Sequence, residues 1–140
     1  MKIRNLKRNQ DGQAMVEFVL VAPILLLLVF GIIQFGTVFN HYLTLTDAVR
    51  AGARQAAVSR TLSDPVGAAT GRVKAAAANL DTTPGVLDIT VDPYDPIQRT
   101  HSWAQGGDVT VTAKYPYSIS LLGFVVKSGQ LTSQTTERVE

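Results

Sequence analysis

The chain has 140 residues, of which 46% are apolar and 17% are charged, and its formal net charge is +2. This composition excludes a disordered chain, which would have fewer apolar residues, and the nearly neutral charge leaves no basic stripe for binding nucleic acid. The chain has no cysteine, which excludes disulfides, Cys-ligated zinc and iron–sulfur clusters.

The N-terminal leader is basic, and we place it at residues 1–12. Its four basic residues lie within the first eight positions and are Lys2, Arg4, Lys7 and Arg8. Beyond the apolar segment that follows, the first acid is Asp47 and the first arginine is Arg50. Because positive residues favour the cytoplasmic side of a membrane, we expect residues 1–12 inside the cell and residues 41–140 outside it.

An apolar segment runs from Phe18 to Phe39, and Gln34 interrupts it. A helix of about 20 residues crosses a bilayer core, so the sequence predicts a transmembrane helix over residues 13–40, kinked at Pro23. A buried core helix is the alternative, but a chain this short could hardly surround so apolar a segment. A cleaved secretory signal is disfavoured, because the segment is long and ends without a small-residue cleavage site.

Glu17 stands at the start of the apolar segment, between Val16 and Phe18. One interpretation is a hydrated acid at the level of the lipid headgroups. The other begins with a peptidase that cuts after Gly12 and leaves Gln13 as a new N-terminal ammonium. Because residues four apart share one helix face, Glu17 could then neutralise this ammonium or that of a neighbouring subunit.

The helix is expected to continue beyond the membrane, because residues 43–60 contain no proline and only one glycine, Gly52. Small residues dominate one face of this stretch, which favours close packing against another element. Arg50 and Arg54 are four apart and therefore lie side by side. They form either a solvated basic face or a contact with acidic residues of the same domain or of a neighbouring subunit.

A second helix is predicted over residues 65–80, with Asp64 as its N-cap and Pro65 in its first position. Three later segments alternate with the period of two that is typical of strands: residues 86–91, 108–115 and 131–139. We therefore expect an α+β fold, in which the long N-terminal helix and a second helix pack on a small antiparallel sheet of about three strands.

Two connections complete the predicted domain. The segment from Asp92 to Pro96 contains two prolines and is expected to end the first strand. Residues 120–126 form an apolar connection. We expect this connection to pack in the core or to contact a partner, with contact at the membrane surface as the third possibility.

Residue patterns for catalysis are missing from the sequence. The only histidines are His41, where the helix would leave the membrane, and His101, in a predicted loop. No zinc-protease, nucleophile-elbow, P-loop or dinucleotide motif occurs. Asp88, Asp92 and Asp95 are weak candidates for a cation, and turn hydrogen bonds are the better interpretation of the last two. We expect no enzymatic activity, no cofactor, no metal and no small-molecule substrate.

The N-terminal region resembles a known family. A basic leader, then Gly12, four residues, Glu17, the aromatic Phe18 and a long apolar helix look like a class III prepilin leader. The stretch Gly12-Gln13-Ala14-Met15-Val16-Glu17-Phe18, with Pro23 following, is similar to the TadE-like family of the tight-adherence (Flp pilus, type IVc) secretion system.

A second block carries the same resemblance. Residues 47–57 contain the core Arg50-Ala51-Gly52-Ala53-Arg54, which is similar to what TadE-like proteins carry just after their membrane helix. The strand at residues 109–115 and a later Leu-Leu-Gly turn are similar as well. The resemblance covers most of the chain and is strongest over residues 10–60.

This resemblance implies a minor pilin or pseudopilin that supports pilus assembly, adhesion, biofilm formation and secretion. It implies cleavage by a prepilin peptidase after Gly12, Gln13 as the mature N-terminus and Glu17 as the assembly glutamate. The implied partners are membrane lipid, other pilin or pseudopilin subunits and an assembly platform in the bacterial inner membrane. Two alternatives remain open: an uncleaved, membrane-tethered binding or envelope-scaffold protein, and an extracytoplasmic enzyme.

Overall fold

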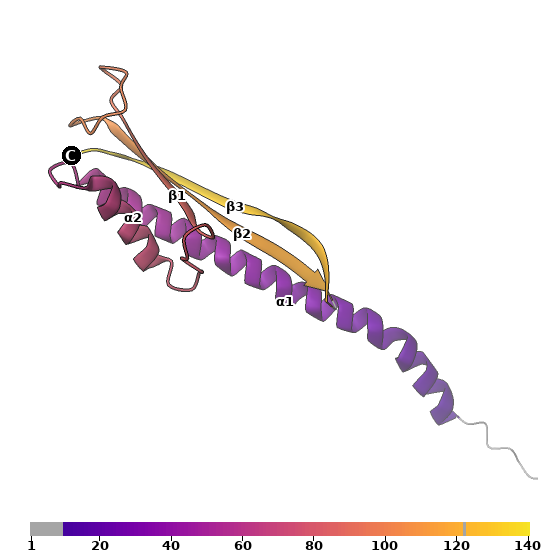
Figure 1. Cartoon of the computed structure of the whole chain (residues 1–140). Coiled ribbons are helices and arrows are strands. Elements are labelled where there is room, and N and C mark those ends of the chain that lie inside the picture. Colours follow the sequence, from indigo (N-terminus) through magenta and orange to yellow (C-terminus); the bar gives the residue numbers. More distant parts are fainter. Residues whose placement is uncertain (1–9, 122) are drawn as a thin grey trace, which may run out of the picture.

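The computed structural model describes residues 10–121 and 123–140. Over these residues the chain forms two helices and three strands: α1 (Gln10–Ala57), α2 (Pro65–Ala76), β1 (Asp88–Tyr94), β2 (Asp108–Leu121) and β3 (Phe124–Arg138). Figure 1 shows the sheet lying along the C-terminal part of α1, with α2 beside them. The predicted fold class is confirmed: an α+β arrangement of a long helix, a second helix and a three-stranded antiparallel sheet.

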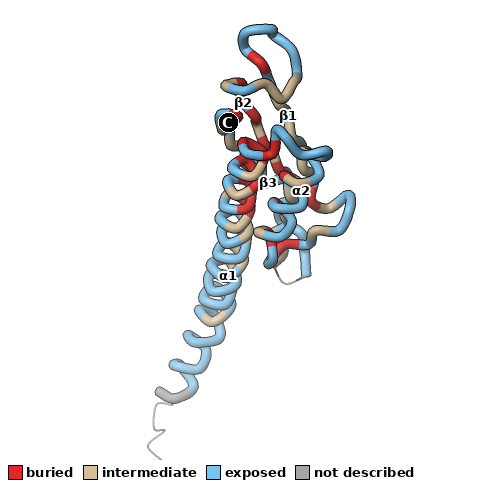
Figure 2. Tube along the Cα trace, turned by 90° about the vertical axis from the view of Figure 1, so that its left-hand side faces the viewer, coloured by how far each residue is buried: buried red, intermediate tan, exposed pale blue. Residues whose placement is uncertain are grey.

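The first helix, α1, is continuous over 48 residues, which corresponds to about 72 Å at 1.5 Å per residue. Its N-terminal part is strongly apolar and is not buried against the rest of the structure, so α1 is long and apolar enough to cross a membrane. Burial begins at Leu45 and includes most positions that face the sheet or α2 up to Ala57 (Figure 2). The predicted membrane helix and the predicted outer domain therefore share one helix, which passes residue 40 without a break.

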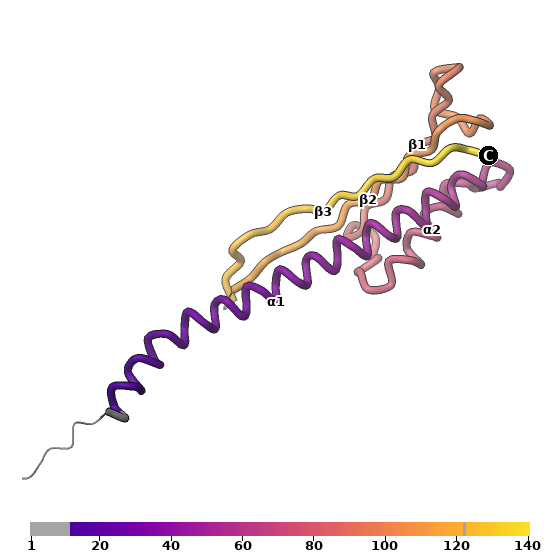
Figure 3. The backbone as a smooth tube through the Cα atoms, turned by 180° about the vertical axis from the view of Figure 1, so that it is seen from behind, coloured from indigo at the N-terminus to yellow at the C-terminus, as the bar shows by residue number. Residues whose placement is uncertain are grey.

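Pro23 lies inside α1 and does not interrupt it. A proline removes one backbone donor and pushes against the carbonyl of the preceding turn, so a local bend is expected. The N-terminal turns of α1, at the indigo end in Figure 3, do bend away from the axis of the rest of the helix.

The sheet has the strand order β1-β2-β3, and both pairs are antiparallel. Along the first half of β2, Val109, Val111 and Ala113 are buried, whereas Thr110 and Thr112 between them are only half-buried. Because successive strand residues point to opposite faces, the three buried residues lie on one face of the sheet, and this face packs against the helices. On the other face Thr110 and Thr136 share a hydrogen bond of 2.8 Å between their hydroxyl groups.

The hydrophobic core lies where this sheet face meets α1 and α2. Its members are mostly small or β-branched: Leu45, Ala48, Val49, Ala53, Ala56, Ala57, Ala69, Val73, Ala77, Leu80, Leu87, Val109, Val111, Ala113 and Val139. The small residues let the backbones approach closely, so a thin core suffices to hold two helices on the sheet.

The second helix begins as predicted: Pro65 is in the first turn, and the Asp64 carboxylate accepts a hydrogen bond of 2.8 Å from the backbone N–H of Gly67. Its C-terminal end is earlier than predicted, at Ala76 rather than near residue 80. Leu80 is nevertheless buried in the core, because the chain turns inward after the helix. Apolar spacing alone does not distinguish these two cases.

The first strand differs from the prediction. It was expected to end before Asp92, but β1 continues to Tyr94, and Pro93 pairs with Val109. β1 is an edge strand. The N–H groups along its free edge bond to no other strand, so a proline, which has no N–H, is tolerated in such a strand. Proline therefore did not break this strand.

The hairpin formed by β2 and β3 is much longer than predicted. The segment expected to be an apolar connection, residues 120–126, contains the turn of this hairpin, where Leu121 pairs with Phe124. Gly123 has φ +86°, which a glycine adopts without strain in a tight turn. The expected core packing is wrong for the strand that leaves the turn, because Phe124, Val125 and Val126 are exposed.

Candidate functional site

The predicted processing position lies in the first turns of α1. Gly12 and Gln13 are exposed, and a Cβ placed on Gly12 would meet no heavy atom within 4 Å. Among the described residues, nothing therefore covers this part of the chain. Glycine is a poor helix former, so a helix that begins near Gly12 opens there more easily than at later turns.

Glu17 is exposed one helical turn after Gln13, and residues at this spacing lie on one face of a helix. Its neighbours on α1 are large, apolar and exposed: the exposed fractions are 73% for Met15, 63% for Val16 and 67% for Phe18. A shallow apolar hollow of about 260 Å³ lies among Met15, Val16, Val19 and Leu20. Once lipid or another helix covers this surface, the carboxylate is in a low-dielectric setting and needs a positive partner.

The two arginines of the second predicted region lie near the other end of α1. Arg50 Nη1 is 3.6 Å from Asp47 Oδ1, and the two side chains are 61% and 76% exposed. A pair this exposed adds little to stability. Arg54 is also exposed, and among the described residues no carboxylate lies within ion-pair distance of it. Both guanidinium groups therefore face solvent and are available to a partner.

Gly52 lies between these arginines in the sequence but is buried. A Cβ on Gly52 would overlap Cγ2 of Val73 and would lie 3.4 Å from the backbone oxygen of Ala69. The glycine thus allows α1 and α2 to approach closely. The sequence pattern places Gly52 on a packing face but does not identify α2 as the neighbour.

A polar cavity between α1 and β2 was missed by sequence analysis. It has a volume of about 210 Å³ and is lined by Gln34, Thr37, Val38, His41, Tyr115, Pro116, Tyr117 and Ser118. The His41 and Tyr115 rings meet edge to face, with their centroids 5.7 Å apart. Gln34, which interrupts the apolar segment, therefore faces protein across this cavity. Its spacing from Thr37 and His41 follows one helix face, and this polar stripe was the available signal.

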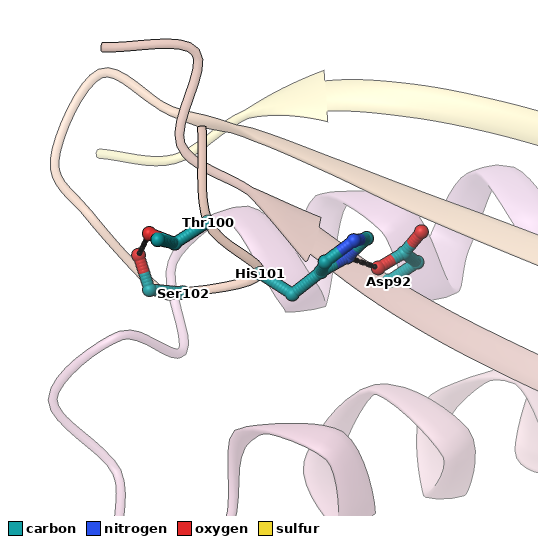
Figure 4. Close-up of polar contacts among 4 residues, drawn as sticks. All are labelled: Asp92, Thr100, His101 and Ser102. Carbon is teal, nitrogen blue, oxygen red and sulfur yellow. Dashed lines mark hydrogen bonds and ion pairs between the residues drawn. The ribbon is translucent and has the colours of Figure 1, made fainter. Parts of the chain in front are cut away.

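The remaining polar residues of interest lie in β1 and in the loop after it (Figure 4). His101 Nδ1 lies 2.6 Å from Asp92 Oδ1, and their side chains are 70% and 52% exposed. Asp95 is buried and accepts hydrogen bonds from the backbone N–H groups of Ile97 (2.8 Å) and Gln98 (3.2 Å). The turn role predicted for Asp95 is confirmed, whereas Asp92 pairs with His101 instead.

Neither arrangement is suited to metal binding or catalysis. Among the described residues, no group of three or more His, Cys, Asp or Glu side chains lies together. The His101–Asp92 pair is open to solvent, whereas catalytic pairs work in sheltered clefts that also hold a reacting group.

One carboxylate outside the proposed membrane segment is perturbed. Asp81 Oδ1 accepts hydrogen bonds from the hydroxyl of Thr83, at 2.5 Å, and from its backbone N–H, at 2.9 Å. The hydroxyl bond first, and the backbone bond second, hold the pKa of Asp81 below its usual value of 3.8. The charged form is favoured because both donors point at it.

Comparison with known proteins finds one family whose model matches the N-terminal region. The model of the family described as TadE-like protein matches residues 12–54. This range contains the exposed apolar part of α1, Glu17 and the arginine pair, whereas α2 and the sheet lie outside it. The search of curated proteins and the search of solved structures returned no match.

Proposed function

Since the model of the TadE-like family matches residues 12–54, we propose that the chain is a TadE-like protein and acts as a membrane-anchored minor pilin or pseudopilin that supports assembly of tight-adherence pili. The match confirms the resemblance predicted from the sequence over residues 12–54. The role in adhesion, biofilm formation or secretion, and the place of the chain within or beside the fibre, belong to the proposal.

The observation that carries the proposal is the form of α1. Its N-terminal part exposes large apolar side chains along its length, from Met15 to Phe39, while its C-terminal part is buried against the sheet. An exposed surface of this size is unsuited to water. It suits a helix that first lies in lipid and later packs side by side with the same helix of other subunits.

We propose that a prepilin peptidase cleaves after Gly12. The new ammonium of Gln13 would then lie about one helical turn from Glu17, and the two opposite charges compensate each other where water is excluded. The same carboxylate can pair with the ammonium of a neighbouring subunit and so set the axial register between them. Exposure of Gly12 and Glu17 on α1 supports both steps.

The proposed topology follows from the charges in the sequence. The basic leader, residues 1–12, stays in the cytoplasm, residues 13–40 span the inner membrane, and residues 41–140 form the outer domain. The proposed partners are membrane lipid, other pilin or pseudopilin subunits and the inner-membrane assembly platform. The exposed Arg50 and Arg54 are the proposed contact with acidic groups of such a partner, and no catalytic role is assigned to the chain.

Intact-mass measurement of the protein recovered from bacterial membranes tests the proposal. We expect a mass that lacks residues 1–12 when the prepilin peptidase is present, and the full-length mass when its gene is deleted. Gly12→Val should block the cut without disturbing packing, because the position touches nothing within 4 Å. A full-length mass in the presence of active peptidase would instead support the alternative, an uncleaved tethered binding or scaffold protein.

A further inference from the structure

The end of the β2–β3 hairpin carries a cluster of large apolar side chains that the domain itself does not cover. The exposed fractions are 78% for Phe124, 66% for Val125 and 63% for Val126. We call these three residues the hairpin tip. They lie at the start of β3, directly after the turn, far from the core residues of the same hairpin.

The hairpin tip is apolar on both faces of the sheet. Phe124 pairs with Leu121 and Val125 with Ser120, and consecutive strand residues point to opposite faces, so Phe124 and Val125 project on opposite faces, whereas Val126 lies in the bulge that follows them. Near its start, by contrast, β2 alternates between buried Val109 and Val111 and half-buried threonines, as a strand does when one face lies on a core and the other in water. A strand end that is apolar on both faces suits apolar surroundings on both sides.

The hairpin tip also lies beside the apolar segment of α1. β2 runs along α1 toward the N-terminal end of the helix (Figures 1 and 3), and Ser118 and Gln34 line the same polar cavity. From Ser118 to the end of β2 at Leu121 the strand advances about 10 Å further. At 1.5 Å per residue this brings the turn roughly level with residues 27–28 of α1, near the middle of the apolar segment.

We propose that the hairpin tip inserts into the outer leaflet of the membrane beside α1 and forms a second lipid contact of the chain. This inference rests on the proposed membrane anchor. Lipid is the occupant that the placement favours, because the tip continues the exposed apolar surface of α1, including Phe30 and Ile33, at the same depth. The polar cavity around Gln34 then lies nearer the headgroups than the tip does.

The polar atoms of the hairpin limit how deep it goes. Beyond Lys114, β2 is no longer paired with β1, so one edge of its backbone lacks strand partners and is costly to place in hydrocarbon. The tip therefore goes no deeper than the outer leaflet, where water and headgroups can follow the open edge inward. Lys127, exposed directly after the tip, is long enough to place its ammonium among lipid phosphates.

Site-specific fluorescence tests the inference, because the chain has no cysteine of its own. Single cysteines replace Val125 in the tip, Leu28 in the apolar segment and Ile97, an apolar residue that is 89% exposed in the loop after β1. Each full-length variant carries an environment-sensitive fluorophore and is placed in phospholipid nanodiscs at one copy per disc. Lipids with a nitroxide on the acyl chain then act as quenchers.

We expect blue-shifted emission and loss of intensity to nitroxide at positions 28 and 125, and neither effect at position 97. In the background of Phe124→Ser and Val126→Ser, quenching should disappear at position 125 and persist at position 28. Quenching at position 28 but not at position 125 would overturn the inference and leave the anchor intact, whereas quenching at neither position would overturn the anchor as well. A blue shift at position 125 that requires several copies per disc, without nitroxide quenching, would assign the tip to a second copy of the chain and also overturn the inference.

Discussion

At the residue scale, Glu17 is a carboxylate on a helix surface that is otherwise apolar. Replacing it with alanine should leave membrane insertion intact, because the apolar segment is unchanged. Leaving a buried ammonium without its partner costs about 3–5 kcal/mol, so we expect incorporation into filaments to fall by at least about tenfold, the equivalent of 1.4 kcal/mol. Quantitative immunoblotting of sheared pili against membranes measures this ratio.

The control removes another acid from the same helix. Asp47 is exposed and lies beyond the apolar segment, so Asp47→Ala should alter incorporation little. Glu17→Gln tests charge separately from shape, and it should behave like the alanine variant. Wild-type incorporation of Glu17→Ala would contradict the pairing.

Asp81 offers a second test at this scale. Its pKa should lie below 3.8, because the Thr83 hydroxyl and N–H both donate to it. Thr83→Val removes the hydroxyl donor and keeps the backbone donor, so the pKa should rise toward its usual value. An NMR titration of the Asp81 carboxyl in detergent micelles measures the shift, and Thr82→Val is the matched control.

The sign of the pH effect follows from the direction of that shift. A carboxylate whose folded pKa is depressed stabilises the fold above its unfolded pKa. Its contribution is lost as the pH falls through the folded pKa, below 3.8. A midpoint above 3.8 in the wild-type chain, or no change in Thr83→Val, would contradict the hydrogen-bond explanation.

At the element scale, the contact between α1 and α2 depends on Gly52. Gly52→Ala adds a methyl group that overlaps the side chain of the buried Val73. Overpacking typically costs about 1–3 kcal/mol, and the better helix propensity of alanine offsets up to about 1 kcal/mol of it. We expect a net loss of about 1–2 kcal/mol in the free energy of unfolding. Denaturant unfolding, monitored by the fluorescence of the single tryptophan, Trp103, measures this loss.

The matched control is Gly71→Ala in α2, where an added Cβ meets nothing within 4 Å. This variant should gain about 0.5–1 kcal/mol, because alanine favours the helix. Combining Gly52→Ala with Val73→Ala should recover part of the loss if the two side chains compete for the same space. Equal stabilisation by Gly52→Ala and Gly71→Ala would contradict the close helix approach.

The elements also show what sequence patterns reveal. The start of α2 was predicted because its cap is local, within Asp64 to Gly67. The far half of the hairpin, residues 116–130, was missed because its two strands pair with each other but do not pack on the core. A strand without a buried face has little reason to alternate apolar and polar residues, so period-two analysis does not detect it.

At the scale of the whole molecule, the fold class was predictable because long-range order here follows strong local patterns: an apolar helix, a capped helix and alternating strands. Roles in processing and pairing could be proposed for Gly12, Gln13 and Glu17 because these residues are close in sequence, and the roles remain predictions. The polar cavity joins α1 to residues about 80 positions later, a proximity that only the tertiary fold creates. Gln34 was therefore interpreted as an interruption of the apolar segment and not as part of a polar face.

The continuity of α1 has a mechanical consequence. A helix without a hinge between its apolar and core-packed parts transmits a pull along its axis directly to the sheet. At the far end, the backbone N–H of Glu140 donates to the carbonyl of Ala57 at 3.0 Å, and Arg60 Nε donates to the carbonyl of Glu140 at 3.2 Å. Axial tension would thus load the interface in shear, across many side chains at once, and would not peel the strands away one by one.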